Sequence, residues 1–263
     1  MSYGHYGSRT GRLPKEAFRP SPLFLGLVAL LAVSGWMAWT GFGNQKINVF
    51  LFVAAGWTIS LCLHEYSHAL VAFKGGDDDV AHRGYLTLNP LKYTHPLLSI
   101  VLPLVFVLIG GIGLPGGAVW INHGAIRSRF VDSLISFAGP ATNLVMAIVL
   151  VLPFSFGLDT AAGQPAFWAG LAFLAFLQLT ASVLNFVPVP GVDGGNLLYP
   201  WLSPQWQRGF NHVAPYGMLL LIALLWSPVI NGWFFNVVYG VGDLIGLPSY
   251  QAADGYNLFR FWS

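Results

Sequence analysis

The residues most able to do chemistry lie close together in the sequence His64-Glu65-Tyr66-Ser67-His68. Residues four apart lie on one face of a helix, so both imidazoles can bind one metal ion while Glu65 lies beside them. A carboxylate in that position can take a proton from a zinc-bound water, which generates hydroxide near neutral pH for attack on a peptide carbonyl. The pattern predicts a hydrolytic zinc site with His64 and His68 as ligands and Glu65 as the general base.

A hydrolytic zinc site usually has a third protein ligand and one open position. The best candidate for that ligand is Asp193, which lies in the sequence Asn185-Phe186-Val187-Pro188-Val189-Pro190-Gly191-Val192-Asp193-Gly194-Gly195. The prolines end a helix, and the glycines let the chain turn closely around a metal or a substrate. The alternatives are an ordinary helix stop with a capping aspartate and, for the histidines, interfacial side chains hydrogen-bonded to their neighbours.

The elements that position these residues belong to a membrane protein. Hydrophobic residues make up 55% of the 263 residues and charged residues only 8%, against about 25% charged in a soluble domain. Several apolar stretches reach the roughly 20 residues that a helix needs to cross a bilayer. A net charge of +2 does not suggest nucleic acid, and the single cysteine, Cys62, excludes an internal disulfide and a cysteine-rich metal site.

We expect an all-α polytopic membrane protein with about five to six transmembrane helices. Residues 1–21 form a cytoplasmic tail in this interpretation, and residues 22–263 form one transmembrane domain. Glu65 lies within an apolar stretch, where ionisable residues usually mark function. The expected spans cover residues 22–42, 47–73, 131–158, 166–187 and 216–247, the last as one kinked span or two short ones.

The chain resembles the site-2 protease family of intramembrane zinc proteases, over roughly residues 47–200. The family has a His-Glu-x-x-His helix and a later Asn-x-x-Pro-x-Pro-x-x-Asp-Gly segment, and both are complete here. A further family feature, Gly-Pro-x-x-Asn, occurs as Gly139-Pro140-Ala141-Thr142-Asn143. The segment Leu86-Thr87-Leu88-Asn89-Pro90-Leu91 looks like the compact bacterial subgroup that has no PDZ domain.

By this resemblance, the protein would cleave transmembrane segments of membrane proteins with one Zn²⁺ per subunit. His64, His68 and Asp193 would bind the zinc, and Glu65 would be the base. Asn185 and Asn143 would lie on the substrate side: Asn185 would hold the substrate strand or the oxyanion, and Asn143, with Gly139, would support helix packing around the site. The location would be the plasma membrane of a bacterium. A catalytically inactive scaffold of the same fold and a metal transporter remain alternatives.

The basic residues of the N-terminal stretch predict a cytoplasmic N-terminus, so the span that holds His64 would run inwards and the active site would open toward the cytoplasm. Asp193 must reach the same depth, which requires an odd number of crossings between residues 73 and 166. We therefore expect residues 97–121 to form a re-entrant or membrane-associated β-hairpin between the two zinc-ligand helices, and residues 159–164 to lie outside.

Two smaller expectations concern the segment before this hairpin. Residues 86–88 look strand-like and, with the hairpin and the segment around Asn185, could pair with an unwound substrate by strand addition. His95 could be an accessory metal ligand, or a histidine at the membrane interface. The sequence does not indicate the substrate, a regulatory signal or an oligomeric state.

Overall fold

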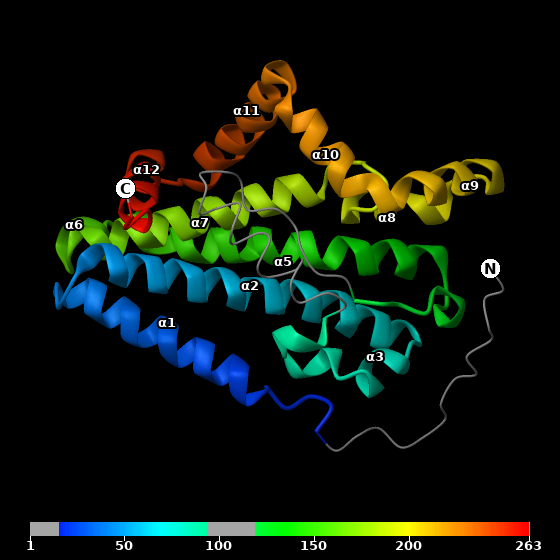
Figure 1. The fold of residues 1–263 in the computed structure, drawn as a ribbon, viewed down its shortest axis with the longest axis horizontal. Helices are drawn as coiled ribbons and strands as arrows, with labels where there is room; N and C mark the ends of the chain where they lie inside the picture. Colours follow the sequence, from blue (N-terminus) through cyan, green and yellow to red (C-terminus); the bar gives the residue numbers. More distant parts are fainter. Residues whose placement is uncertain (1–15, 94–118, 263) are drawn as a thin grey trace.

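The computed structural model describes residues 16–93 and 119–262, and the regular structure of these residues is entirely helical. Four long helices form the bundle: α1 (Pro22–Thr40), α2 (Gln45–Gly75), α5 (Arg129–Ser155) and α7 (Pro165–Asn185). In Figure 1 they lie side by side, with α2 and α7 running in one direction and α1 and α5 in the other. The all-α prediction is thus confirmed for the described residues.

Local capping explains where the first two helices begin and end. The hydroxyl of Ser21 accepts a hydrogen bond from the Phe24 amide at the start of α1, and Asn44 caps α2 in the same way. Each helix stops at a left-handed glycine, Gly41 after α1 and Gly76 after α2, because glycine adopts positive φ without a steric penalty. α2 therefore extends two residues beyond its expected span at each end.

Apolar surface on the outside of the bundle supports a membrane setting. In the described part of the chain, five helical stretches are long and apolar enough to cross a bilayer, namely α1, α2, α5, α7 and residues 204–226. The most apolar part of α7 is 83% buried and that of α1 only 22%, so α7 is the central helix and α1 lies at the edge. Helix α5 exposes Val145 and Val149, which are each more than half accessible. Such residues are stable in contact with lipid. The chain is a polytopic membrane protein.

The C-terminal part packs partly on this bundle. α9 (Pro204–Val213) leads into α10 (Gly217–Trp226), and α11 (Pro228–Ile245) follows. Figure 1 shows α10 and α11 as two arms that project from the bundle. The break falls at Ser227, because Pro228 starts a new helix and cannot continue the previous one. Residues 216–247 are therefore two helices. The last helix, α12 (Ser249–Phe259), packs against α7 through Gly255, where a Cβ would collide with the Ala169 carbonyl.

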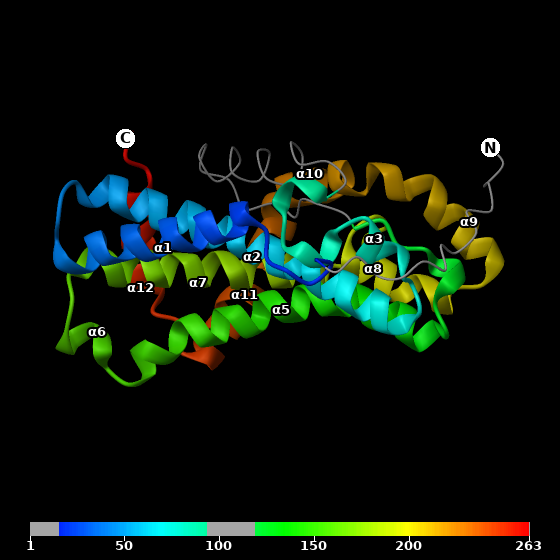
Figure 2. The same cartoon turned by 90° about the horizontal axis from the view of Figure 1, so that it is seen from below.

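The segment between α2 and α5 starts and finishes at the same end of the bundle. The amide of Arg127, just before α5, donates to the carbonyl of Gly75, the last residue of α2, over 3.2 Å. Only α5 then runs between this end and the start of α7 among the described residues, as both views of the bundle show (Figures 1 and 2). The expected odd number of crossings agrees with this arrangement.

The strand expected at residues 86–88 is wrong. Tyr85–Thr87 form a turn of 3₁₀ helix, η1, between two left-handed residues, Gly84 and Leu88. The Thr87 hydroxyl closes this turn by donating to the Gly84 carbonyl over 2.7 Å. A strand interpretation failed because alternation over three residues carries too little signal to exclude a turn. The expected β-hairpin lies mostly outside the described residues, as does His95, and residues 119–121 have no regular secondary structure.

Candidate metal centre

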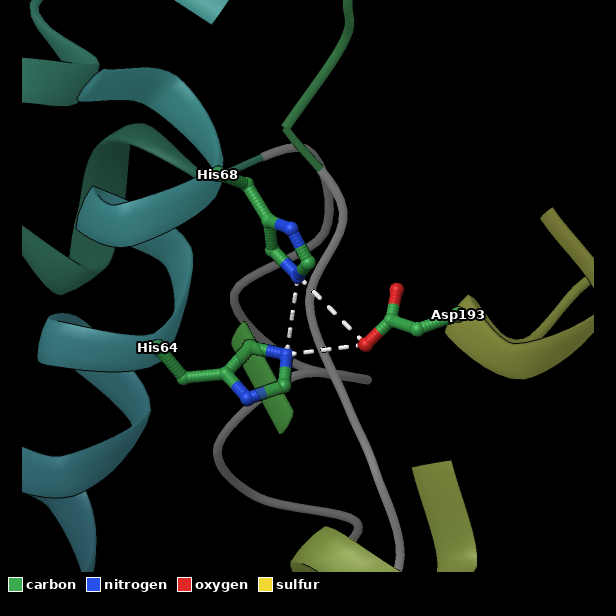
Figure 3. Close-up of side chains that lie close together, drawn as sticks. All are labelled: His64, His68 and Asp193. Atoms are coloured by element: carbon green, nitrogen blue, oxygen red, sulfur yellow. Dashed lines mark hydrogen bonds and ion pairs between the residues drawn. The ribbon is translucent and has the colours of Figure 1, made fainter. Parts of the chain in front are cut away.

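Helix α2 carries two of the expected metal ligands on one face. His64 and His68 are each 6% exposed, and their Nε2 atoms are 3.0 Å apart. The carboxylate of Asp193 lies opposite them, with Oδ2 at 3.1 Å from Nε2 of His64 and at 3.4 Å from Nε2 of His68 (Figure 3). The structure thus brings together one atom from each of the three residues, although Asp193 follows His68 by 125 positions in the sequence.

These separations suit a zinc ion. In a tetrahedral site with bonds of about 2.0 Å to nitrogen and oxygen, the ligand atoms lie roughly 3.3 Å from each other. The observed separations of 3.0, 3.1 and 3.4 Å are close to that value. Two imidazoles and one carboxylate are also a donor set found in hydrolytic zinc sites, where a fourth position stays open. The residues present therefore fit the metal that the sequence predicts.

The turn after α7 delivers Asp193 to this position. α7 ends at Asn185, and Asp193 is the first residue of the short helix α8 (Asp193–Leu198). Gly191 has φ of 91° at the turn between them. At Gly194 a Cβ would lie 2.5 Å from the carbonyl carbon of Phe186, so the chain folds back closely on the end of α7. Larger residues at these glycines would move the carboxylate away from the histidines.

Neighbouring groups on α5 orient both imidazoles. Nδ1 of His68 donates to the carbonyl of Ile135 over 2.6 Å, and Nδ1 of His64 lies 3.3 Å from the side-chain oxygen of Asn143. When Nδ1 carries the proton, Nε2 is left with its lone pair free for a metal. Pro140 lies in the same part of α5 and removes a backbone donor from it. Asn143, expected beside the substrate, thus also contacts a predicted ligand.

Gly139 leaves the space between the two histidines open. A Cβ at this position would lie 2.6 Å from Nε2 of His64, and Nε2 of His68 would be closer still. No side chain other than hydrogen fits there without displacing the imidazoles. This geometry is consistent with the role expected for Gly139, which is close helix packing around the site. Gly139 packs against the predicted ligand atoms themselves.

Glu65 lies beside these ligands in a buried position. Its side chain is 3% exposed, and its Oε2 atom has no hydrogen-bond partner in the described part of the chain. A buried carboxylate oxygen without a partner is costly. Such an oxygen is typical of a residue that forms its hydrogen bond with a substrate or a reacting water.

All of these side chains line one cavity of about 170 Å³. Asn185, which is 4% exposed, is part of its wall, so the structure brings together the predicted ligands His64, His68 and Asp193 with Glu65, Asn143 and Asn185. The wall also includes His123, Ser136 and Asn196, which the sequence analysis missed. No spacing pattern singles these three residues out, because each reaches the cavity only through the packing of its own segment.

The fold and the site define a membrane protein with two buried histidines and one partly buried aspartate that could together hold a metal ion. Comparison with known proteins agrees. The chain is 46% identical to a Mycolicibacterium smegmatis protein provisionally named zinc metalloprotease Rip2, over 256 residues that cover 95% of this chain and 96% of the relative. A Mycobacterium tuberculosis protein of the same name is 48% identical over 260 residues, covering 97% and 98%.

A more distant relative comes from Bacillus subtilis. The protein provisionally named zinc metalloprotease YwhC is 30% identical over 185 residues, 65% of this chain and 78% of the relative. No family model matches the chain, and no solved structure matches it. The identity to the mycobacterial proteins over nearly the whole length shows that the chain belongs to their family of zinc metalloproteases, the site-2 protease family.

Proposed function

We propose that the protein is an intramembrane zinc endopeptidase that cleaves transmembrane segments of membrane proteins in a bacterial cell membrane. The observation that carries this proposal is the position of the metal centre. Its two histidines and Glu65 are buried on α2, one of the helices long and apolar enough to cross a bilayer. A buried ionisable cluster in such a helix is expensive unless it has a function.

Each residue has a role in the proposed reaction. His64, His68 and Asp193 would hold one zinc ion per chain, and zinc when bound would polarise the peptide carbonyl and acidify water. Glu65 would take a proton from the attacking water and pass it to the leaving amide nitrogen. Its unpartnered Oε2 atom supports this role, since it has room to accept that proton. Asn185, on the cavity wall, would donate a hydrogen bond to the peptide.

The substrate must unwind before it can react. A peptide bond within a transmembrane helix is shielded by its own hydrogen bonds, and no water is available in the hydrocarbon to replace them. A cavity of about 170 Å³ admits a short extended segment and not a whole helix. The substrate would therefore enter the cavity with a few residues locally unwound, and its remaining residues would stay helical outside.

The central test compares the wild-type chain with Glu65→Gln in vesicles that contain a labelled transmembrane peptide. Loss of the base should reduce cleavage by several orders of magnitude, while zinc content stays at one ion per chain because the three ligands remain. Removal of zinc by a chelator should stop wild-type cleavage, and added zinc should restore it. Turnover by Glu65→Gln at the wild-type rate would contradict the role of Glu65.

The same measurements separate the alternatives. A scaffold of this fold would bind zinc and leave the peptide intact, in the wild-type chain as well as in the variant. A metal transporter would move zinc into the vesicles whether or not a peptide is present. Only a protease would combine stoichiometric zinc with cleavage that depends on Glu65.

A further inference from the structure

A short segment between α2 and α5 forms one wall of the catalytic cavity. Val119, Ile121 and His123 all line it. The segment is held at the end of α2 by a buried carboxylate, because Oδ2 of Asp77, a residue 1% exposed, accepts a hydrogen bond from the Asn122 amide over 2.8 Å. Arg83 also lies over the ring of Trp120, 4.4 Å from its centroid. The backbone just before His123 is therefore attached to the end of α2 and to the segment that follows α2.

The imidazole of His123 is oriented by a second carboxylate. Its Nδ1 atom lies 2.7 Å from Oδ1 of Asp132, which is in the first turn of α5. This contact uses one ring nitrogen, and within the described part of the chain no group bonds to the other, Nε2. The side chain is 60% exposed, so an incoming molecule can reach it. An oriented histidine with a free nitrogen on a catalytic cavity is a candidate for substrate contact.

A charged donor on the cavity wall would add to the neutral donor that Asn185 supplies. An unwound peptide presents carbonyl groups that have lost their helical hydrogen bonds, and negative charge develops on the attacked carbonyl oxygen. None of the described residues that line the cavity is a lysine or an arginine. Glu65 and Asp193 are acceptors when ionised, and Asn143 already contacts His64. Among the described residues that line the cavity, His123 is thus the one side chain outside the predicted metal ligands that can supply a positively charged donor.

We propose that His123 is a further substrate-contacting residue, which donates a hydrogen bond from Nε2 to a backbone carbonyl of the unwound peptide, and that Asp132 is its positioning residue. This inference rests on the proposed function and extends it. Donation requires a proton on Nε2 while Nδ1–H bonds to Asp132, which is the imidazolium form. The contribution of His123 should therefore depend on pH.

The carboxylates that face His123 support that form. Its hydrogen bond to Asp132 raises the pKa of His123 above the ordinary value. Partial burial of the ring lowers this pKa, but the negative charges of Asp132 and Asp77 raise it further. These are the charged groups that face it from α5 and from the end of α2. Because the pKa is raised, the imidazolium persists to higher pH and is lost only as pH rises through the raised value.

The experiment measures kcat/KM for peptide cleavage against pH in His123→Ala, His123→Gln and Asp132→Asn. His123→Ala should lower kcat/KM roughly tenfold to a hundredfold at pH values where the wild-type ring is protonated, which corresponds to losing one charged hydrogen bond. His123→Gln keeps a donor that does not titrate, so its kcat/KM should lie between those of His123→Ala and the wild type. Its kcat/KM should also no longer fall at alkaline pH. Asp132→Asn should shift that fall to lower pH.

The matched control is His212→Gln, since His212 on α9 is exposed and is not among the residues of the cavity wall. A second readout does not need turnover: in the Glu65→Gln background, His123→Ala should weaken binding of the uncleaved peptide at low pH more than at high pH. The zinc content of each variant shows that the site has folded.

Two results would overturn the inference: superimposable pH profiles of His123→Gln and the wild type, or peptide binding to the Glu65→Gln chain that is unchanged by His123→Ala. Either result could occur while the wild type still cleaves with zinc bound, which leaves the proposed function intact. A wild-type chain that binds zinc and never cleaves would instead refute the proposed function, and the binding measurement would still decide the role of His123.

Discussion

A glycine on α5 lies directly against the candidate metal ligands. Gly139 faces Nε2 of both His64 and His68, at a distance that excludes any side chain. The same turn of α5 supplies the Ile135 carbonyl to His68, and Asn143, one turn further on, contacts His64. α5 therefore provides the open space and the outer hydrogen bonds, while α2 and α8 provide the ligand atoms.

The substitution Gly139→Ala tests whether metal binding requires the open space beside the two imidazoles. Its methyl group would occupy the space beside the two nitrogen atoms, so we expect zinc affinity to fall by roughly a hundredfold or more and cleavage to fall with it. Zinc affinity can be measured by competition with a chromogenic chelator.

The matched control is Gly240→Ala on α11, where a Cβ would meet nothing within 4 Å. That substitution should leave zinc affinity unchanged and stabilise the helix by up to about 1 kcal/mol, because alanine has the higher helix propensity. Equal zinc affinity in both variants would show that the close approach at Gly139 has no role.

Among the elements, the connection between α2 and α5 depends on the buried Asp77. Its two oxygens accept backbone amides from both sides of the segment, Oδ1 from Asp79 over 3.1 Å and Oδ2 from Asn122 over 2.8 Å. Gly76 is equally constrained, since a Cβ would lie 2.7 Å from the Ala125 carbonyl. The wall of the cavity is thus positioned by hydrogen bonds made outside the cavity.

We predict that Asp77→Ala loosens this wall. The Asn122 amide would lose its partner, at a cost of about 1–3 kcal/mol, so hydrogen exchange across residues 119–127 should become roughly tenfold faster and cleavage should fall. The neighbouring Asp78 is exposed, and Asp78→Ala should change neither measurement. The prediction fails if exchange in residues 119–127 is the same in the two variants.

Over the whole molecule, the two segments that meet at the metal centre come from the same end of the bundle. α2 and α7 run in parallel, and Asp193 follows the end of α7 where His64 and His68 approach the end of α2 (Figure 1). The short helix α6 (Leu158–Ala161) lies at the opposite end, between α5 and α7. In a membrane, these two ends would face different compartments.

The basic residues near the N-terminus predict that the metal end faces the cytoplasm. Cysteines introduced as Asp78→Cys and Ala161→Cys, both exposed positions, should therefore react from opposite sides of intact cells. An impermeant thiol reagent added outside should label Ala161→Cys, and Asp78→Cys should react only after the membrane is opened. The native Cys62 is fully buried and gives a low background. Labelling of Asp78→Cys from outside would contradict the proposed orientation.

Local chemistry was enough to predict much of this protein. The apolar stretches and the prolines that end them place the four bundle helices within a few residues of their observed bounds, because helix formation and termination depend on neighbouring residues. The His64 to His68 spacing places both imidazoles on one face for the same reason. Even the parallel direction of α2 and α7 could be deduced, since Asp193 can join the histidines only from the same end.

Contacts between distant segments had no comparable signal in the sequence. The approach of Gly139 to both imidazoles, the contact of Asn143 with His64 and the arrival of His123 on the cavity wall all depend on how α5 and its preceding segment pack against α2. The helical turn at residues 85–87 likewise replaced an expected strand, since three residues do not specify their own conformation. A residue's type sets which bonds it can make, and packing selects its partner.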